Sequence, residues 1–118
     1  MGRFYHYTDE KGYKAILKSR KIKKSKMKVG DAVYGTGVYL TRLSPQDRTK
    51  GGIARNNYGH DSLEKARLKD GRVDYWFEFD IDEARLENVS GERDIWLLMN
   101  SSLKFDDFLM TNHGKFEN

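Results

Sequence analysis

The chain has 118 residues, which is enough for one domain with a single hydrophobic core and too few for two. Apolar residues make up 37% and charged residues 34%, and 7 Tyr, 6 Phe and 2 Trp supply material for that core. The lack of cysteine excludes disulfides and thiolate metal sites, the net charge is only +4, and the three histidines lack the spacing of metal ligands. We therefore expect one ordered domain over residues 1–118 with no bound metal.

The first part of the chain predicts a strand, a helix and a second strand. Residues 3–7 predict the first strand, and Thr8 is placed to cap a helix over residues 9–19. A basic connection leads to a strand over residues 32–41 that is interrupted by glycines.

The middle of the chain predicts helices. Ser44-Pro45-Gln46-Asp47 is typical of a helix start, because it combines a capping serine, a proline at the first helical position and an acidic residue three positions after the cap. Gly51-Gly52 is expected to interrupt this helix. A second short helix is expected over residues 63–69, after Asp61 and Ser62 as capping residues.

The last third predicts strands. Residues 73–81 alternate between apolar and polar side chains, the period-two pattern of a half-buried strand. Residues 95–99 are too apolar for anything but a central strand, and residues 103–109 predict a last strand or hairpin. The order of elements predicts an α+β fold that is mostly strand, with the helices inserted early.

Charge is distributed unevenly along the chain. Residues 1–60 hold 14 basic and 4 acidic side chains, whereas residues 61–118 hold 8 and 14. The basic excess is greatest from Lys18 to Lys28, where seven of eleven residues are Lys or Arg. This basic cluster has two interpretations: a solvated lysine-rich surface, or a surface that meets the phosphates of a dinucleotide or a nucleic acid.

The chain carries no membrane or export signal that can be recognised. No apolar run approaches the roughly 20 residues of a membrane span, and Met1-Gly2-Arg3-Phe4 enters the first strand without an apolar leader. We expect no membrane partner, and either a cytoplasmic protein or one delivered into a target cell without a classical signal peptide.

Two segments carry the strongest chemical signal. Phe4-Tyr5-His6-Tyr7-Thr8 places a histidine where the first strand ends, and Tyr34-Gly35-Thr36-Gly37-Val38-Tyr39-Leu40-Thr41 passes through two glycines before a tyrosine. A histidine can bond a sugar hydroxyl, and a tyrosine ring can stack on a flat aromatic ring. Nicotinamide riboside combines both features.

Cleavage of the bond between ribose and nicotinamide produces a cationic, oxocarbenium-like sugar, so a carboxylate is needed nearby. Asp94, directly before the predicted central strand, is the best-placed candidate. The other candidate carboxylates are Glu92, Asp106, Asp107 and Glu78.

Residues 4–43 resemble a known family. Tyr5-His6-Tyr7-Thr8, Gly12, Ile16-Leu17 and the segment from Tyr34 to Leu40 are similar to the first half of the diphtheria toxin-like and poly-ADP-ribose-polymerase-like ADP-ribosyltransferases. The resemblance is greatest to the compact His-Tyr-Asp signature group, many of which are toxin or effector domains. It implies a split, twisted, mostly antiparallel sheet with an NAD cleft between its halves, and NAD as co-substrate.

The resemblance also implies roles for individual residues. His6 would contact one of the two riboses, the backbone of Tyr7 would hold the nicotinamide carboxamide, and Thr8 would support a ribose hydroxyl. Tyr39 would stack on nicotinamide, with Tyr58 as the second stacking aromatic. The sequence itself suggests that Gly35 and Gly37 would let backbone amides approach the ring closely. Polymerases carry a glycine directly after the histidine, and the tyrosine here leaves only a backbone contact.

The resulting hypothesis is an enzyme that moves ADP-ribose from NAD to a protein or nucleic acid, with an inhibitor or immunity protein as a further partner. Three alternatives stay open. Water could be the acceptor, which would make the domain an NAD glycohydrolase, or the domain could be an inert basic module that binds nucleic acid or ADP-ribose. An NAD-dependent RNA 2′-phosphotransferase would need a cleft lined by arginines, for which the candidates are Arg3, Arg42, Arg48 and Arg55.

Each site residue also has a purely structural interpretation. His6 and Tyr39 could be ordinary strand residues, and Tyr58 could anchor a loop. Asp94 could form a surface ion pair with Arg93, Arg85 or Lys104.

Overall fold

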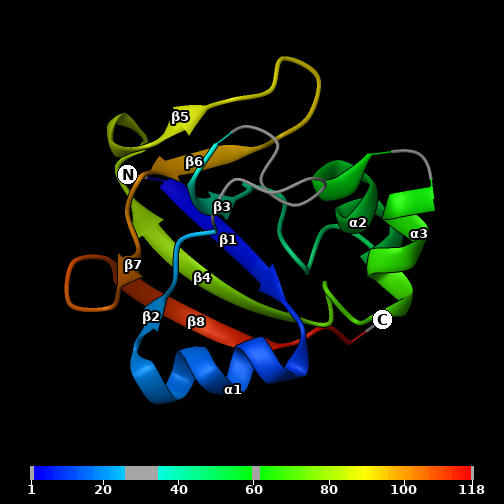
Figure 1. The fold of residues 1–118 in the computed structure, drawn as a ribbon, viewed down its shortest axis with the longest axis horizontal. Coiled ribbons are helices and arrows are strands. Elements are labelled where there is room, and N and C mark those ends of the chain that lie inside the picture. The colour runs from blue at the N-terminus through cyan, green and yellow to red at the C-terminus, as the bar shows by residue number, and fades with distance from the viewer. Residues whose placement is uncertain (1, 26–34, 60–61, 118) are drawn as a thin grey trace.

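The computed structural model describes residues 2–25, 35–59 and 62–117, which form eight strands, three α-helices and one 3-10 helix (Figure 1). In chain order these are β1 (Gly2–Thr8), α1 (Glu10–Ser19), β2 (Lys21–Ile22), β3 (Gly37–Leu40), α2 (Lys50–Tyr58), α3 (Ser62–Lys69), β4 (Tyr75–Ile81), η1 (Glu83–Arg85), β5 (Glu87–Asn88), β6 (Trp96–Met99), β7 (Leu103–Lys104) and β8 (Leu109–Lys115).

The strands form three small antiparallel sheets, in the orders β1-β4-β8, β3-β6-β5 and β2-β7. In Figure 1, α1 runs along one side of the β1-β4-β8 sheet, and α2 and α3 pack together at one end of it. The expectation of an α+β fold with mostly antiparallel strands and early helices is confirmed.

The two larger sheets meet at an isolated backbone bridge between Tyr5 of β1 and Thr41, directly after β3. The amide of Tyr5 donates to the carbonyl of Thr41 at 2.7 Å, and the amide of Thr41 donates to the carbonyl of Tyr5 at 3.0 Å. The sheet is therefore split, and its two halves are joined where β1 passes the end of β3.

Two hydrophobic clusters fill the faces of β1. Phe4 belongs to the larger cluster, which lies between the two large sheets and includes Trp96, whose ring meets that of Phe4 edge to face at 5.3 Å. Tyr5 and Tyr7 point to the other face, where they pack with Ile53 of α2. This alternation follows from the two-residue period of a strand, and it buries β1 on both sides.

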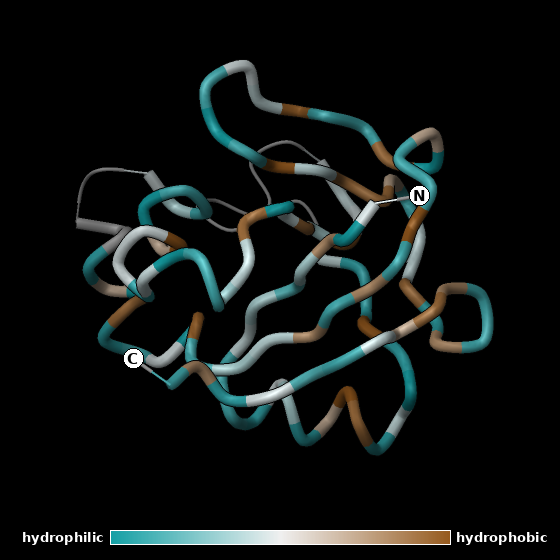
Figure 2. The backbone as a smooth tube through the Cα atoms, turned by 180° about the vertical axis from the view of Figure 1, so that it is seen from behind, coloured by the Kyte–Doolittle hydropathy of each residue, from teal (hydrophilic) through white to brown (hydrophobic). Residues whose placement is uncertain are grey.

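Helix α1 begins one residue later than the sequence predicts. Thr8 is not the cap, because its backbone remains in the ladder opposite Tyr75. Asp9 caps the helix instead, and its carboxylate accepts a hydrogen bond from the amide of Gly12 at 2.7 Å. Ile16 is the buried residue of α1, and Figure 2 shows one hydrophobic stretch in this otherwise mostly hydrophilic helix.

The predicted helix start at Ser44 is wrong. Residues 44–47 form a turn in which the Asp47 amide lies 3.2 Å from the Ser44 hydroxyl oxygen, its acceptor. Helix α2 begins after Thr49, whose hydroxyl accepts from the amide of Gly52 at 3.1 Å. Gly51 and Gly52 therefore lie in the first turn of α2 and do not interrupt a helix. The helix begins later than predicted, because Thr49, just before this turn, is its capping residue.

The C-terminal strands differ from the prediction in two ways. β4 is the middle strand of its sheet and is covered on both faces, so Trp76 and Glu78, expected on a solvated face, are buried. The chain after β7 forms a separate long strand, β8, which is an edge strand with mostly exposed side chains. Its polar sequence carries little of the alternation by which a half-buried strand is recognised.

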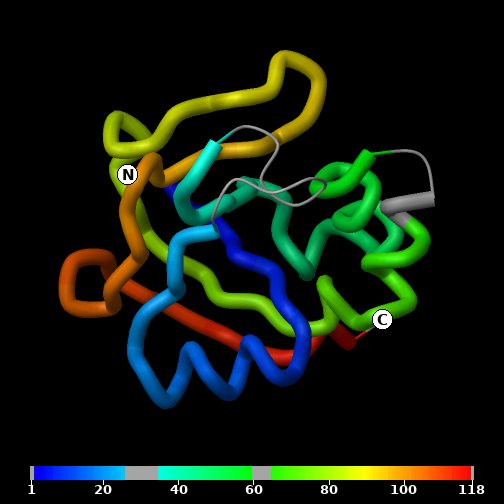
Figure 3. The backbone as a smooth tube through the Cα atoms, in the orientation of Figure 1, coloured from blue at the N-terminus to red at the C-terminus, as the bar shows by residue number. Residues whose placement is uncertain are grey.

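Figure 3 shows the two ends of the chain on opposite sides of the molecule. Among the described residues, no helix is long and apolar enough to cross a membrane. Several sequence predictions fall outside the described residues: the start of the strand at residues 32–34, which includes Tyr34, the capping residue Asp61, and Lys26 and Lys28 of the basic cluster.

Candidate functional site

A pocket of about 350 Å³ lies between β1, α1, the end of β3 and the end of α2. Five of the residues predicted to bind NAD line it. These are His6, Tyr7, Thr8, Tyr39 and Tyr58. Residues separated by up to half the chain therefore share one concave surface, which is the usual form of a small-molecule site.

His6 is held by the neighbouring strand. Its Nδ1 lies 2.9 Å from the carbonyl oxygen of Tyr39, and because a carbonyl can only accept, Nδ1 carries the proton. Burial lowers the pKa of His6, and the hydrogen bond to Tyr39 opposes that shift only in part. The imidazole is consequently neutral near pH 7, and its Nε2 is a hydrogen-bond acceptor.

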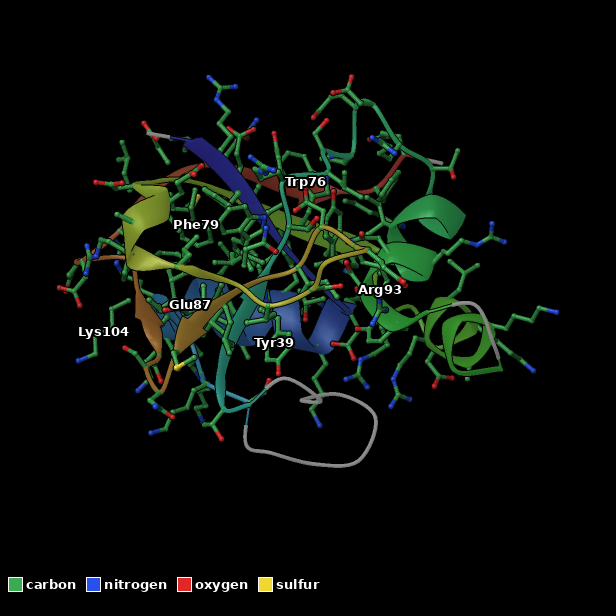
Figure 4. The ribbon with its side chains drawn as sticks, turned by 90° about the horizontal axis from the view of Figure 1, so that it is seen from above. Tyr39, Trp76, Phe79, Glu87, Arg93 and Lys104 are labelled. Atoms are coloured by element: carbon green, nitrogen blue, oxygen red, sulfur yellow. The ribbon has the colours of Figure 1, made fainter. Side chains whose placement is uncertain are left out.

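Tyr39 contributes both its backbone and its ring. While its carbonyl orients His6, its hydroxyl donates to the carbonyl of Gly35 at 2.7 Å, and its half-buried ring lines the pocket. In Figure 4, Tyr39 lies in front of α1, and residues of α1 line the same pocket. A ring fixed at its hydroxyl end keeps its orientation when a ligand arrives, which favours stacking.

Gly37 does not line the pocket. A side chain at this position would overlap the carbonyl oxygen of Leu98 on β6, and the φ of Gly37 is +155°. A glycine at this position lets β3 lie close to β6. It affects the site through the placement of β3.

Tyr58 is the last residue of α2 and is not in a loop. It lines the pocket together with Asn57, and the guanidinium of Arg67 lies 5.8 Å from the centre of its ring. Sequence reasoning did not find Asn57 or Arg72, another lining residue, because neither belongs to a motif.

Asp94 lies beside the pocket but does not line it, whereas its neighbour Ile95 does. The Asp94 carboxylate accepts hydrogen bonds from the amide of Arg42 at 2.9 Å and from the hydroxyl of Thr41 at 3.3 Å. The Arg42 guanidinium also approaches it, at 3.4 Å. The ion pair is thus formed with Arg42 and not with the expected Arg93, Arg85 or Lys104.

No carboxylate lines the pocket within the part of the chain that the structure describes. Glu92, Asp106 and Asp107 are exposed elsewhere. Glu78 is buried on β4, where it accepts from the hydroxyls of Tyr5 at 2.7 Å and Thr111 at 2.6 Å.

Glu78 is a charged residue that stabilises the fold, as the direction of its pKa shift and its hydrogen bonds indicate. Burial alone would raise the pKa of Glu78, but the hydrogen bonds from Thr111 and Tyr5 and the charge of Arg3 outweigh it, so the net shift is downward. Glu78 is therefore ionised and tied to β1 and β8. Within the described ranges, no group of three or more His, Cys, Asp or Glu could hold a metal ion.

The pocket has a basic lining. Lys21, Lys23 and Arg72 line it, whereas Lys18 and Lys24 of the basic cluster are exposed outside it. The basic cluster thus has two parts, of which one faces the pocket. Three cations in a lining whose described residues include no carboxylate favour an anionic ligand.

The depressed pKa of His6 predicts a pH effect on stability. Below its ordinary value of 6.5, the unfolded state takes up a proton that the folded state does not. The free energy of unfolding should therefore fall by up to about 1 kcal/mol between about pH 7.5 and about pH 5.5. His6→Asn keeps a donor near the Nδ1 position and does not titrate, so it should flatten this dependence in denaturant melts. Equal slopes for both proteins would contradict this assignment of His6.

The chain was compared with known proteins. No curated protein and no solved structure gives a significant match. The model of one protein family matches residues 4–106, which is most of the chain and extends well beyond the two opening motifs. The family is described as the HYD1 signature containing ADP-ribosyltransferases, and its name, Tox-ART-HYD1, associates it with toxins. The chain belongs to this family of ADP-ribosyltransferases.

Proposed function

We propose that the domain binds NAD in the pocket around His6 and Tyr39 and transfers ADP-ribose to a macromolecule, releasing nicotinamide. The observation that carries the proposal is that His6, Tyr39 and Tyr58, from three separate elements, line a single pocket in a chain of this family. A toxin-type transferase would also require an inhibitor or immunity protein in the cell that makes it.

The nicotinamide riboside half would lie between the strand ends and α2. Tyr39 and Tyr58 supply aromatic rings for the nicotinamide, and the backbone of Tyr7 supplies hydrogen-bonding groups for its carboxamide. His6 would accept a hydrogen bond from a ribose hydroxyl through Nε2, because Nδ1 is already bonded to Tyr39. Thr8 would support a second hydroxyl.

The phosphates of NAD would lie toward the basic part of the lining. Lys21 and Lys23 come from β2 and the residue after it, and Arg72 precedes β4. A dinucleotide carries two phosphate charges, and these cations can neutralise them without competition from carboxylates among the described lining residues. The lining therefore suits the whole dinucleotide as well as its nicotinamide end.

Asp94 remains our proposal for the carboxylate that stabilises the sugar cation. Its neighbours Thr41 and Ile95 both line the pocket, whereas no such contact supports Glu92, Asp106 or Asp107. Glu78 is committed to Tyr5 and Thr111. For Asp94 to act, its carboxylate would have to turn from Arg42 toward the pocket or act across Ile95.

Incubation with NAD labelled in its adenosine half, with and without a cell extract, tests the function. Label in protein or nucleic acid supports transfer, free ADP-ribose alone indicates a glycohydrolase, and intact NAD indicates an inert binding module. Release of nicotinamide, followed in parallel, reports cleavage whichever acceptor is used.

NAD should raise the melting temperature of the domain, because it binds the folded state selectively. Tyr39→Ala should remove most of this shift, since ring stacking contributes roughly 0.5–1.5 kcal/mol beyond burial. Tyr39→Phe keeps the ring, loses the hydrogen bond to the Gly35 carbonyl, and should retain the shift. If Tyr39→Ala folds and keeps the full shift, NAD binds elsewhere.

Asp94→Asn should keep NAD affinity but lower turnover by roughly 10²–10³, the scale of one lost electrostatic contact in the transition state. The asparagine retains an oxygen for the Arg42 amide, so the fold should persist. Glu92→Gln is the matched control, because Glu92 is exposed and lies two residues away. Loss of NAD binding with unchanged turnover per bound NAD would assign Asp94 a structural role.

Substitutions in the two parts of the basic cluster should have different effects in a transfer assay. Lys21→Ser/Lys23→Ser should weaken NAD binding, because both residues line the pocket. Lys18→Ser/Lys24→Ser should lower transfer to the macromolecule and leave NAD hydrolysis nearly unchanged. The second effect should vanish at high salt, since exposed charges are screened within about 10 Å at 0.1 M. Equal losses in both reactions for both double variants would show that the cluster does not divide in this way.

A further inference from the structure

Asn56 occupies a junction of three segments that form the wall of the pocket. It lies in the last turn of α2, directly before the lining residues Asn57 and Tyr58, and does not itself line the pocket. Its side-chain amide reaches the segment that enters β6, 38 residues further along the chain.

The Asn56 amide pairs with both polar groups of one backbone residue. Its Oδ1 accepts from the amide of Asp94 at 2.8 Å, and its Nδ2 donates to the carbonyl of Asp94 at 2.8 Å. This two-point contact fixes the orientation of the side-chain amide, because exchanging its oxygen and nitrogen would set donor against donor and acceptor against acceptor. Asp94 is thereby held in position at its backbone.

The second N–H of the Asn56 side chain faces residues that line the pocket. Nδ2 lies 3.0 Å from Oδ1 of Asn57 and 3.3 Å from the hydroxyl of Thr41, both of which belong to lining residues. An amide nitrogen has only two hydrogens and one is used by the Asp94 carbonyl, so the shorter contact, to Asn57, takes the other. The orientation of the Asn57 side chain is then also set.

The backbone of the same residue makes a further link. The carbonyl of Asn56 is one of the last four of α2, which have no partner within the helix, and the guanidinium of Arg93 donates to it at 3.1 Å. A cation at a helix C-terminus also complements the helix dipole. Figure 4 shows Arg93 on the side of the molecule where α2 lies. Three hydrogen bonds thus connect Asn56 with residues 93–94.

We propose that Asn56 is a positioning residue that holds Asp94 and the last turn of α2 in one fixed arrangement around the pocket. This inference rests on the proposed function for the role of Asp94 in catalysis. Asn56 acts through Asp94 on turnover and through Asn57 and Tyr58 on the shape of the pocket. It is not expected to touch NAD.

Hydrogen exchange followed by NMR tests the contact without any activity assay. Asn56→Ala should accelerate exchange of the Asp94 amide by about tenfold, the scale of one net hydrogen bond. Asn88→Ala, an exposed asparagine on β5, is the control and should leave that amide unchanged. If Asn56→Ala does not fold, the wild-type protein supplies the test: the side-chain N–H groups of Asn56 should exchange more slowly than those of exposed Asn88, because they donate to the Asp94 carbonyl and to Asn57. Equal exchange of the two side-chain amides, or no change in folded Asn56→Ala, would overturn the proposal.

A double-mutant cycle on NAD turnover tests the consequence. Asn56→Ala should lower kcat by about tenfold in the wild-type background and by less than about twofold in the Asp94→Asn background, because two residues that act as a unit are not additive. The same fold loss in both backgrounds would mean that Asn56 does not act through Asp94. If the wild-type protein fails to turn over NAD, the proposed function is wrong, and the exchange measurement still decides whether Asn56 holds Asp94.

Discussion

The backbone bridge between Tyr5 and Thr41 is the contact on which the pocket depends. It fastens the end of β3 to the middle of β1, and so brings the carbonyl of Tyr39 within 2.9 Å of Nδ1 of His6. Together with the His6–Tyr39 hydrogen bond, this bridge sets the spacing of the β1-β4-β8 and β3-β6-β5 sheets at the pocket. Glycine at position 37 serves the same end, because it lets β3 lie against β6 where a side chain would collide with the Leu98 carbonyl.

Burial around this junction determines the polarity of the site. The carbonyl of Tyr39 on β3 accepts a hydrogen bond from Nδ1 of His6, and burial disfavours a second proton on the ring. Nε2 of His6 is therefore a hydrogen-bond acceptor. The carboxylate buried nearby, Glu78, is occupied by two hydroxyls and leaves the pocket basic. A neutral acceptor beside aromatic rings and lysines matches a ligand that carries hydroxyls, a flat ring and phosphates.

Sequence analysis predicted the local elements better than their connections. β1, β6 and the pairing of a histidine with a tyrosine follow from short patterns, and in the structure the His6 side chain hydrogen-bonds to the backbone carbonyl of Tyr39. The cap of α2 at Thr49 was missed because the signal at Ser44 is stronger: Ser44 is followed by a proline and an acidic residue, whereas Thr49 is followed by Lys50 and two glycines. β8 was missed because an exposed edge strand needs no apolar face, and Asn56 was missed because its contacts span 38 residues.

Asp94 is fixed by contacts that also hold its carboxylate outside the pocket lining. Thr41, Arg42 and Asn56 bind this residue at its side chain and backbone, which anchors the start of β6. The contacts with Thr41 and Arg42 also hold the carboxylate, which does not line the pocket although Thr41 and Ile95 do. The contact with Arg42 is half exposed and therefore weak, of the order of 1 kcal/mol or less, whereas the backbone contacts with Asn56 are independent of where the carboxylate points. Because Asn56 fixes the backbone of Asp94, the carboxylate can exchange its hydrogen bonds with Thr41 and Arg42 for a cationic sugar without moving the start of β6, which is the property that the proposed reaction requires.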